Sequence, residues 1–258
     1  MNEDHEVTGR LPVAYRNEDF LDTPDARAIR ILSEYLHPLA HFRQEKIRDT
    51  IVFFGSARTF ETGINGRYYQ EARELARRVT AWSQSLKGSA RHFVVCSGGG
   101  PGIMEAANRG AAEAGGKTIG LNIGLPFGQR PNPFITPDLC FEFHYFFMRK
   151  FWFAYLAKAL VVFPGGFGTL DELTEILTLV QTQKLVKKMV VILYGTAFWK
   201  EVLNFEALVR HGMISEQDLD LFDFADDVDT AFKMLESGLT KFYLEPERDE
   251  PEIAKSRV

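Results

Sequence analysis

The sequence LVVFPGGFGTLDE, at Leu160–Glu172, joins an apolar run to a glycine-rich turn and the start of a helix. Leu160–Phe163 is apolar at every position, as expected of a strand that is buried on both faces of a sheet. Glycines allow a tight turn after this strand, and apolar residues at helical spacing predict a helix from about Leu170 to Leu185. The three parts together form one strand–turn–helix unit of an α/β protein.

The same alternation of short apolar runs and helical patterns continues on both sides of this stretch. We expect further strands at Ile51–Phe54, Phe93–Cys96, Thr118–Leu121, Leu139–Phe143 and Met189–Leu193. Further helices are expected at Tyr68–Leu86, Pro101–Ala114, Phe146–Lys158, Ala197–Arg210 and Asp226–Leu239. Apolar strands separated by helices are typical of an α/β fold with a Rossmann-like, doubly wound parallel sheet that carries helices on both faces.

The predicted sheet domain covers residues 49–240 and has an extension on each side. Residues 1–48 form an N-terminal extension, in which apolar residues at helical spacing predict a helix over Pro24–Arg48. Pro38 lies inside this segment and is expected to kink or divide the helix. Residues 241–258 form a C-terminal tail.

The composition is that of an ordinary globular protein, and it disfavours several classes of function. The 258 residues are 45% hydrophobic and carry a formal net charge of −5, which disfavours a general nucleic-acid binder. Cys96 and Cys140 lie in apolar runs and are expected to be buried thiols. The polar start of the chain, and the lack of a run of about 18 apolar residues, predict a cytoplasmic protein with no membrane segment. The six histidines are scattered without ligand spacing, so neither a metal nor a cofactor is expected.

Three of the expected strands end in small, glycine-bearing turns, at Phe54–Arg58, Cys96–Gly102 and Phe163–Thr169. Parallel α/β sheets bind ligands beyond the carboxyl ends of their strands. Glycines let the backbone approach a ligand and adopt positive φ, and a helix N-terminus just beyond favours phosphate. Pro101 suits a first helical turn, and Thr169 suits an N-cap. One such loop is equally well explained as a tight turn, but three at one edge predict a ligand site.

The motif PGGxGTxxE at Pro164–Glu172 and the pair Arg149-Lys150 are the candidate chemical groups. Each also has a simpler explanation. Thr169-x-x-Glu172 has the pattern of a capping box, in which Glu172 bonds back to the helix start. Arg149 and Lys150 alone are typical of a solvated helix face, and the aromatic residues around them of a core or a subunit interface. The combination of the pair with the glycine loop favours a functional site.

These motifs, together with SGGGPGIMEAAN at Ser97–Asn108, resemble the LOG (LONELY GUY) family of cytokinin riboside 5′-monophosphate phosphoribohydrolases, whose members are often labelled lysine decarboxylases. The resemblance runs from about Ile51 to Leu193, and the N-terminal extension is similar to that of longer bacterial members. It implies hydrolysis of the N-glycosidic bond of a purine nucleoside 5′-monophosphate, AMP or an N6-modified AMP, to the free base and ribose 5-phosphate. No amino-acid decarboxylation is expected, because no lysine stands in a context that suggests a pyridoxal phosphate Schiff base.

The resemblance implies that Arg149 and Glu172 are catalytic. It also implies that Lys150, Gly165–Thr169 and Thr178 contact the substrate. The complete predicted set of substrate-binding residues is Gly55, Ser56, Ser97, Gly98, Gly99, Gly100, Met148, Lys150, Gly165, Gly166, Phe167, Gly168, Thr169 and Thr178. Gly128 departs from the family pattern, because many relatives carry a glutamate there, near the substrate. The preference for a particular base or ribose is therefore not set by the resemblance.

The chemistry of the reaction agrees with these residue types. Breaking an N-glycosidic bond builds positive charge on the ribose and negative charge on the departing purine. A carboxylate stabilises the cationic sugar or aligns water, which is the role expected of Glu172. An arginine holds phosphate bidentately or stabilises the leaving base, and both roles are open for Arg149.

Two other functions fit the same fold. One is a non-catalytic nucleotide- or molybdenum-cofactor-binding carrier, which needs neither Arg149 nor Glu172. The other is a structural oligomer with a vestigial site, in which the aromatic helix around Arg149 is the interface. A homodimer or larger homo-oligomer is expected with the enzyme as well, because aromatic residues are enriched in interface cores.

Overall fold

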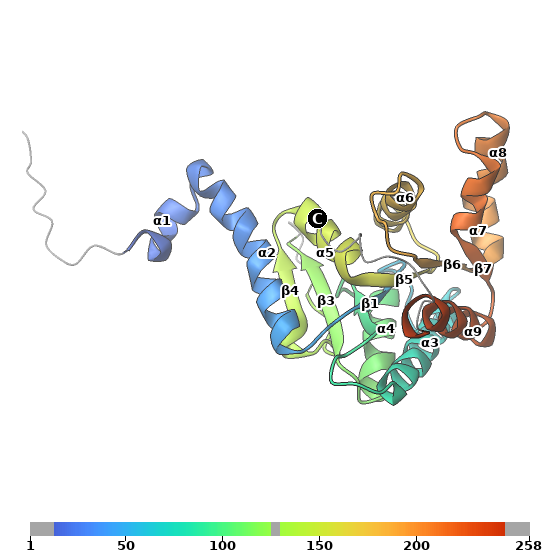
Figure 1. The fold of residues 1–258 in the computed structure, drawn as a ribbon, viewed down its shortest axis with the longest axis horizontal. Coiled ribbons are helices and arrows are strands. Elements are labelled where there is room, and N and C mark those ends of the chain that lie inside the picture. Colours follow the sequence, from blue (N-terminus) through green and yellow to red (C-terminus); the bar gives the residue numbers. More distant parts are fainter. Residues whose placement is uncertain (1–12, 125–129, 246–258) are drawn as a thin grey trace, which may run out of the picture.

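The computed structural model describes residues 13–124 and 130–245, which contain a seven-stranded, fully parallel sheet in the order β4-β3-β2-β1-β5-β6-β7 (Figure 1). The strands are β1 (Thr50–Phe54), β2 (Val94–Ser97), β3 (Thr118–Ile123), β4 (Cys140–Phe143), β5 (Ala157–Val162), β6 (Val190–Tyr194) and β7 (Asp223–Ala225). This sheet confirms the predicted α/β class.

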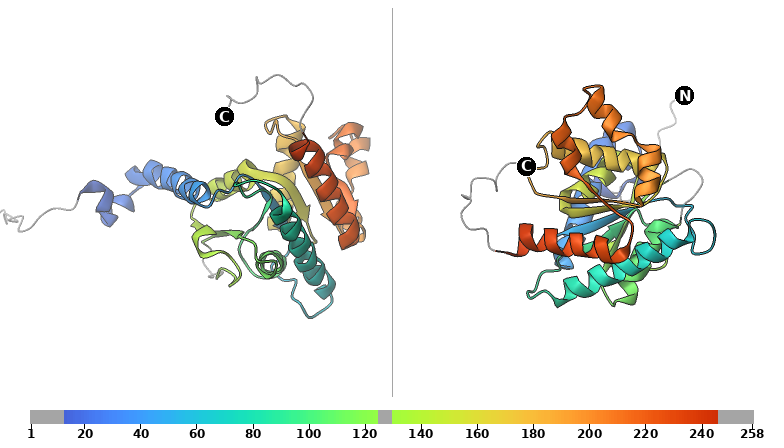
Figure 2. Two further views of the ribbon diagram at one scale, coloured as in Figure 1. Left: turned by 60° about the horizontal axis from the view of Figure 1, so that its bottom comes forward. Right: turned by 90° about the vertical axis from the view of Figure 1, so that its right-hand side faces the viewer.

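Helices cover both faces of the sheet. In chain order they are α1 (Glu18–Leu21), α2 (Arg27–Gln44), α3 (Gly66–Ser85), α4 (Ile103–Glu113), α5 (Phe146–Leu156), α6 (Phe167–Gln181), α7 (Thr196–Val202), α8 (Phe205–Arg210) and α9 (Val228–Leu239). Helices α3, α4 and α9 pack on one face, and α2, α5, α6, α7 and α8 on the other. Figure 2 shows from two further sides that the sheet lies between these two layers. The prediction of a doubly wound sheet is therefore confirmed.

The central strand β1 shows why the strands are mostly apolar. Ile51 and Phe53 pack in the core with α3, α4 and α9, whereas Val52 and Phe54 pack in the core on the opposite face. Successive side chains of a strand point to opposite faces, so a strand covered on both sides favours apolar residues at every position, although Thr50, Ser97, Thr118 and Asn122 are also buried in strands.

The chain reverses its direction across the sheet between β1 and β5. From β1 it steps outward through β2 and β3 to β4, and it then returns to pair β5 with the other side of β1. The connection after β1 enters α3 on one face, and the connection after β5 enters α6 on the other. A crevice opens at the carboxyl ends of such a strand pair, which is where doubly wound sheets bind ligands.

Helix α2 continues through Pro38, so the expected division of this helix is wrong. Proline has no N–H to give to the carbonyl four residues earlier, which is that of Glu34. That carbonyl instead accepts a hydrogen bond from the Trp152 indole nitrogen, at 3.0 Å. A contact with α5 thus replaces the intrahelical bond that Pro38 removes.

Three other differences concern short elements. Strand β7 was not predicted, because its three residues at the sheet edge leave too short an apolar run. The helix expected over Ala197–Arg210 is two helices, since the chain breaks after Val202 and the Asn204 side chain caps α8 by accepting the Ala207 N–H at 2.8 Å. Cys96 is buried as predicted, whereas Cys140 is half-buried, and both thiols are free.

Within the described residues, no helix combines the length and the apolar character that a bilayer crossing requires.

Candidate active site

Two helices on the same face of the sheet bring Arg149 and Glu172 together. Arg149 lies in the first turn of α5, just beyond β4, and Glu172 lies near the start of α6, just beyond β5. The Arg149 Nη2 and Glu172 Oε1 atoms are 3.3 Å apart. Only 14% of the arginine side chain and 5% of the glutamate side chain are exposed. The two predicted catalytic residues therefore form a largely buried ion pair at the carboxyl edge of the sheet.

Aromatic rings enclose the Arg149 guanidinium. Its Cζ lies 5.3 Å from the centre of the Phe146 ring and 5.5 Å from that of Phe153, within the range of cation–π attraction. Its Nη1 lies about as close as a van der Waals contact, 4.0 Å, to the place where a Cβ on Gly98 would stand. Its Nε is buried without a hydrogen-bond partner among the described residues. The guanidinium thus lies next to the second glycine loop, Cys96–Gly102, and one of its buried donors has no partner in the described part of the chain.

Burial changes the proton affinity of the Glu172 carboxyl. It raises the pKa of Glu172 from its usual value of 4.5 to about 7, although Arg149 and Lys150 act in the opposite direction. Burial also lowers the pKa of the Arg149 guanidinium, which Glu172 opposes. A carboxyl group with a pKa near 7 can take up or release a proton at neutral pH, as general acid–base catalysis requires.

Lys150 forms a second ionic contact beside this pair. Its Nζ lies 2.8 Å from Asp171 Oδ1 and 2.8 Å from Glu175 Oε2, both on α6. These contacts fix the side of α5 against α6. Lys150 therefore lies close to the candidate catalytic pair, with its ammonium group engaged by two carboxylates, and its predicted contact with the substrate stays a prediction.

The start of α6 differs from the prediction. Thr169 is not its N-cap, because the helix begins at Phe167 with Gly166 as the capping residue. The Thr169 N–H donates to the Gly166 carbonyl at 3.0 Å, and Glu172 bonds to Arg149 instead of the helix start. The capping-box interpretation of Glu172 is therefore wrong. Thr169 is buried over Gly165, where a Cβ would stand 2.1 Å from the threonine Oγ1.

Backbone hydrogen bonds tie the three glycine loops into one edge. The Ser56 N–H donates to the Pro164 carbonyl at 3.0 Å, and the Ser56 carbonyl accepts the Ile103 N–H at 3.1 Å. Gly55 leaves no space for a side chain, because a Cβ there would stand 2.7 Å from Ile103 Cγ2. In contrast, apart from the adjoining backbone, no atom of residues 13–124 and 130–245 lies within 4 Å of the position of a Cβ on Gly166 or Gly168. The open part of the edge is therefore the first turn of α6.

Buried side chains hold the loop after β2, which is the second glycine loop, in place. Ser97 is fully buried, and its Oγ donates to Asn108 Oδ1 at 2.7 Å and accepts the Gly99 N–H at 3.0 Å. The Asn132 amide donates to the carbonyls of Gly99 and Gly100, at 3.0 and 3.1 Å. Sequence reasoning missed the roles of Asn108 and Asn132. Asn108 ends the quoted SGGGPGIMEAAN motif, whereas Asn132 carries no sequence signal of its own.

Positive φ occurs at fewer glycines of these loops than the sequence suggests. Gly99 and Gly102 have φ of +74° and +72°, and a Cβ on Gly99 would stand 2.3 Å from Asn122 Oδ1. Gly168 is not among the glycines with positive φ. Pro101 stands before α4, which begins at Ile103, so its expected place in the first turn is wrong.

The remaining predicted residues take different places. Met148 is buried in the core, on the sheet side of α5. Thr178 is exposed farther along α6, where its Oγ1 donates to the Thr174 carbonyl at 2.7 Å. Phe167 has 92% of its surface exposed at the start of α6. Gly128 lies outside the residues that the structure describes.

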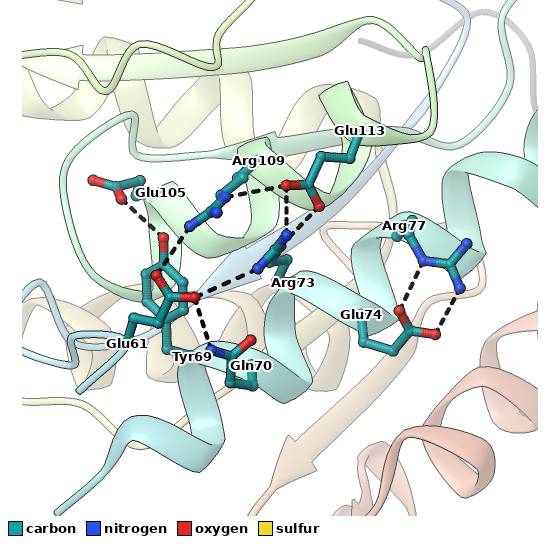
Figure 3. Close-up of polar contacts among 9 residues, drawn as sticks. All are labelled: Glu61, Tyr69, Gln70, Arg73, Glu74, Arg77, Glu105, Arg109 and Glu113. Atoms are coloured by element: carbon teal, nitrogen blue, oxygen red, sulfur yellow. Dashed lines mark hydrogen bonds and ion pairs between the residues drawn. The ribbon is translucent and has the colours of Figure 1, made fainter. Parts of the chain in front are cut away.

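A charged network holds the loop between β1 and α3, which contains Ser56. Glu61 from this loop accepts hydrogen bonds from Gln70 Nε2 at 2.9 Å and from Arg109 Nη1 at 3.1 Å, and pairs with Arg73 (Figure 3). Both arginines also pair with Glu113 at the end of α4. The network therefore fixes the loop to α3 and α4.

Across residues 13–124 and 130–245, no group of three or more potential ligand side chains is placed to hold a metal ion.

A family model described as "Possible lysine decarboxylase" matches residues 104–235. The chain belongs to this family. It is also 29% identical over 178 residues to the rice protein named cytokinin riboside 5′-monophosphate phosphoribohydrolase LOG, from Oryza sativa subsp. japonica. That match covers 67% of this chain and 66% of the rice protein, so the chain spans about two thirds of the relative's length. The predicted relation to the LOG family is therefore confirmed.

Similarity to solved structures supports the fold. The X-ray structure of a structural-genomics target superimposes with a TM-score of 0.53 at 21% identity, covering 73% of this chain and 99% of that chain. The molybdenum cofactor binding protein of Rippkaea orientalis superimposes with a TM-score of 0.51 at 18% identity, covering 74% and 97%. At these identities the likeness shows a common fold and nothing further.

Proposed function

We propose that this protein hydrolyses the N-glycosidic bond of a purine nucleoside 5′-monophosphate, AMP or an N6-modified AMP, to the free base and ribose 5-phosphate. The observation that carries the proposal is the buried pair of Arg149 and Glu172 at the carboxyl edge of the sheet, where the strand order reverses between β1 and β5. The family relation and the name of the rice relative support the same reaction.

The phosphate binds at the first turn of α6. The first N–H groups of a helix have no intrahelical partner, and the helix dipole adds positive potential there. The open space over Gly166 and Gly168 lets an anion approach these groups. Ser97 keeps its hydroxyl for Asn108 and the Gly99 N–H, so its role is to hold the second loop in place.

The ribose lies over Glu172. Hydrolysis breaks the bond between ribose C1′ and the purine nitrogen, and the bonding electron pair leaves with the base. Water adds its oxygen to C1′, and its proton is transferred, with Glu172 as carrier, to the departing base. The carboxylate form of Glu172 also stabilises the positive charge that develops on the sugar.

Arg149 lies between the phosphate site and the second glycine loop. Its contacts with Phe146 and Phe153 restrict its movement, and its N–H groups other than the buried Nε are the donors for the phosphate or for the leaving purine. Either contact is charge-assisted and is stronger in a buried site than in water. Arg149 also keeps Glu172 oriented through the 3.3 Å contact.

The first prediction concerns the reaction. Incubation with AMP and no added metal is expected to release adenine and ribose 5-phosphate, with adenosine reacting far more slowly. Binding energy from the remote phosphate lowers the barrier at the reacting bond, and adenosine lacks that group. Chromatography of free base from a panel of nucleosides and their monophosphates measures both rates. Equal rates for AMP and adenosine would contradict phosphate recognition, and inhibition by EDTA would contradict a metal-free reaction.

The same panel separates the enzyme from a carrier. A nucleotide- or molybdenum-cofactor-binding protein would bind a ligand at this edge without releasing base. Tight binding of AMP in calorimetry with no release of adenine would favour the carrier. The raised pKa of the buried Glu172 favours the enzyme, because a carrier has no use for a carboxyl that titrates at neutral pH.

The second prediction is a homodimer or larger assembly. Large apolar side chains are exposed at Ile29, Leu32 and Leu36 on α2, at Phe146, Phe147 and Tyr155 on α5, and at Phe167 on α6. The first part of α2 also extends away from the sheet, with α1 at its far end (Figure 1). Exposed large apolar side chains concentrated on a few neighbouring elements are typical of contact sites. Light scattering at micromolar concentration is expected to give at least twice the monomer mass, and a monomer mass would contradict the prediction.

The other sequence-based expectations belong to the same proposal. The chain is divided into an N-terminal extension over 1–48, a nucleotide-binding catalytic domain over 49–240 and a tail over 241–258. The protein works in the cytoplasm on a small-molecule substrate, without a cofactor, a nucleic acid or a membrane partner. Fractionation of cells that carry a tagged copy tests the location.

A further inference from the structure

The carboxylate of Glu34, on α2 in the N-terminal extension, contacts the start of α5. Its Oε1 accepts the His144 N–H at 2.7 Å, and its Oε2 accepts the Tyr145 N–H at 3.2 Å. Tyr145 is the N-cap residue of α5, and no side chain of its own segment caps the helix. A carboxylate at a helix N-terminus also interacts favourably with the helix dipole. Glu34 therefore caps α5 from a distance of more than one hundred residues along the chain.

A single residue, Tyr145, links this cap to Arg149. Tyr145 donates its N–H to Glu34 Oε2 at 3.2 Å, and its carbonyl accepts the Arg149 N–H at 3.2 Å. Glu34 thus fixes the orientation of Tyr145 at its N–H. The hydrogen bond between the Tyr145 carbonyl and the Arg149 N–H couples this orientation to the backbone of Arg149. Phe146, whose ring lies against the guanidinium, is the first helical residue after Tyr145.

A second group of contacts holds the next turns of α5 to the same part of α2. The Glu34 carbonyl accepts the Trp152 indole N–H at 3.0 Å. The Tyr35 ring stacks on Trp152, with centres 5.6 Å apart and planes at 20°, and Phe42 meets Trp152 edge-on at 5.2 Å. Helix α5 is therefore bound to α2 on both sides of Arg149.

We propose that Glu34 is a positioning residue, which sets the place of Arg149 through the first turn of α5. The inference rests on the proposed function for its effect on turnover, but its structural part stands on the hydrogen bonds alone. Glu34 does not touch the substrate. Its removal frees the first turn of α5, so that Arg149 meets the ribosyl transition state in a wider range of positions.

The test compares Glu34→Ala with Glu34→Gln by two measurements. Hydrogen exchange of the backbone amides at 144–149 is expected to be at least about tenfold faster in Glu34→Ala. Turnover (kcat) of AMP is expected to fall by about tenfold, with KM changed less than about threefold, because small displacements of a catalytic group weaken catalysis more than binding. Glu34→Gln keeps one acceptor oxygen at the same distance and is expected to recover a large part of both losses.

Asp227→Ala is the matched control. Asp227 caps α9 by accepting the Thr230 N–H at 2.8 Å, and α9 lies on the opposite face of the sheet from α5. Loss of this cap costs a similar amount of stability but is expected to leave the turnover of AMP unchanged. A fall in kcat equal to that of Glu34→Ala would show a general effect of stability and would overturn the proposal.

The remaining outcomes are also decisive. Unchanged exchange at 144–149 in Glu34→Ala would overturn the capping role. Faster exchange with wild-type kcat would overturn the positioning role. If the wild-type protein releases no base from any nucleotide, the proposed function fails, and the exchange measurement alone then decides whether Glu34 orders the start of α5. If Glu34→Ala does not fold, the same comparisons are made between Glu34→Asp and the wild type, because aspartate is one methylene shorter and withdraws the carboxylate from the His144 and Tyr145 N–H groups.

Discussion

Replacing Glu172 by glutamine is expected to lower the turnover of AMP at least about a hundredfold, with AMP affinity close to that of the wild type. Glutamine has the size of glutamate and keeps an oxygen for Arg149 Nη2, which lies 3.3 Å from Glu172 Oε1. It cannot carry negative charge opposite the developing ribosyl cation or transfer the proton of water. Rates of base release and calorimetric titration with AMP measure the two quantities.

The same substitution is expected to change the pH dependence. Because burial raises the pKa of Glu172 to about 7, the wild-type carboxylate is lost as pH falls below 7, and kcat/KM falls about tenfold for each further unit. The variant has no such inflection. A carboxyl whose pKa is raised in the folded state stabilises the fold at low pH, and this stabilisation is lost as pH rises through about 7. The melting temperature of the wild type is therefore expected to fall over this pH range by an amount that Glu172→Gln does not show.

The contrary result is equally informative. If Glu172→Gln turns over AMP at nearly the wild-type rate, Glu172 has no catalytic role and the carrier becomes the preferred function. A large fall in melting temperature would instead show that the ion pair with Arg149 is structural. Burying an arginine without its partner carries a cost of a few kcal/mol, which the glutamine oxygen is expected to offset.

The second large effect is expected from Gly168→Val, which should weaken AMP binding by at least about a hundredfold while the fold survives. Loss of a charge-assisted phosphate contact of about 3 kcal/mol corresponds to that factor. Apart from the adjoining backbone, no atom in the described part of the chain lies within 4 Å of the position of a Cβ on Gly168, and its backbone is not in the left-handed region, so valine fits there. The branched side chain would occupy the space over the first turn of α6 that we assign to phosphate.

Gly168→Ala is the graded control for this substitution. A single methyl group fills less of the same space and is expected to weaken AMP binding by a smaller factor. Circular dichroism and melting temperature test whether both variants fold. Wild-type affinity in folded Gly168→Val would show that the phosphate does not approach the first turn of α6.

The fold could be predicted because its signals are local. Every position of Ile51–Phe54 and Leu160–Phe163 is apolar, and such short runs between helical patterns are typical of a sheet covered on both faces, which is the sheet observed. The errors lie where tertiary contacts decide. Pro38 does not end α2, because the Trp152 indole replaces the hydrogen bond that it removes. Strand β7 forms by pairing with β6 at the sheet edge, and its three residues carry no periodic pattern.

The candidate site was predictable only as a set of residues. The motif at Pro164–Glu172 and the pair Arg149-Lys150 pointed to one place, and the structure brings Arg149 and Glu172 into contact. The alternative interpretation of Glu172 as a cap failed because α6 begins at Phe167, before Thr169, so that the glutamate lies deeper in the helix. The contact between Glu34 and the start of α5 could not be predicted, because it joins segments that are 110 residues apart.

Pro38 also determines how α2 can sit along α5. In the middle of an ordinary helix every backbone carbonyl accepts the N–H four residues later. No carbonyl is then left for a neighbouring indole, and successive turns offer it equivalent contacts. A proline makes one carbonyl, that of Glu34, different from the rest, and Trp152 donates its N–H to that carbonyl. Sliding α2 by a single turn would leave both groups without a partner. The residue that usually interrupts a helix therefore fixes the axial alignment of two helices, and with it the height at which the Glu34 carboxylate meets the Tyr145 N–H.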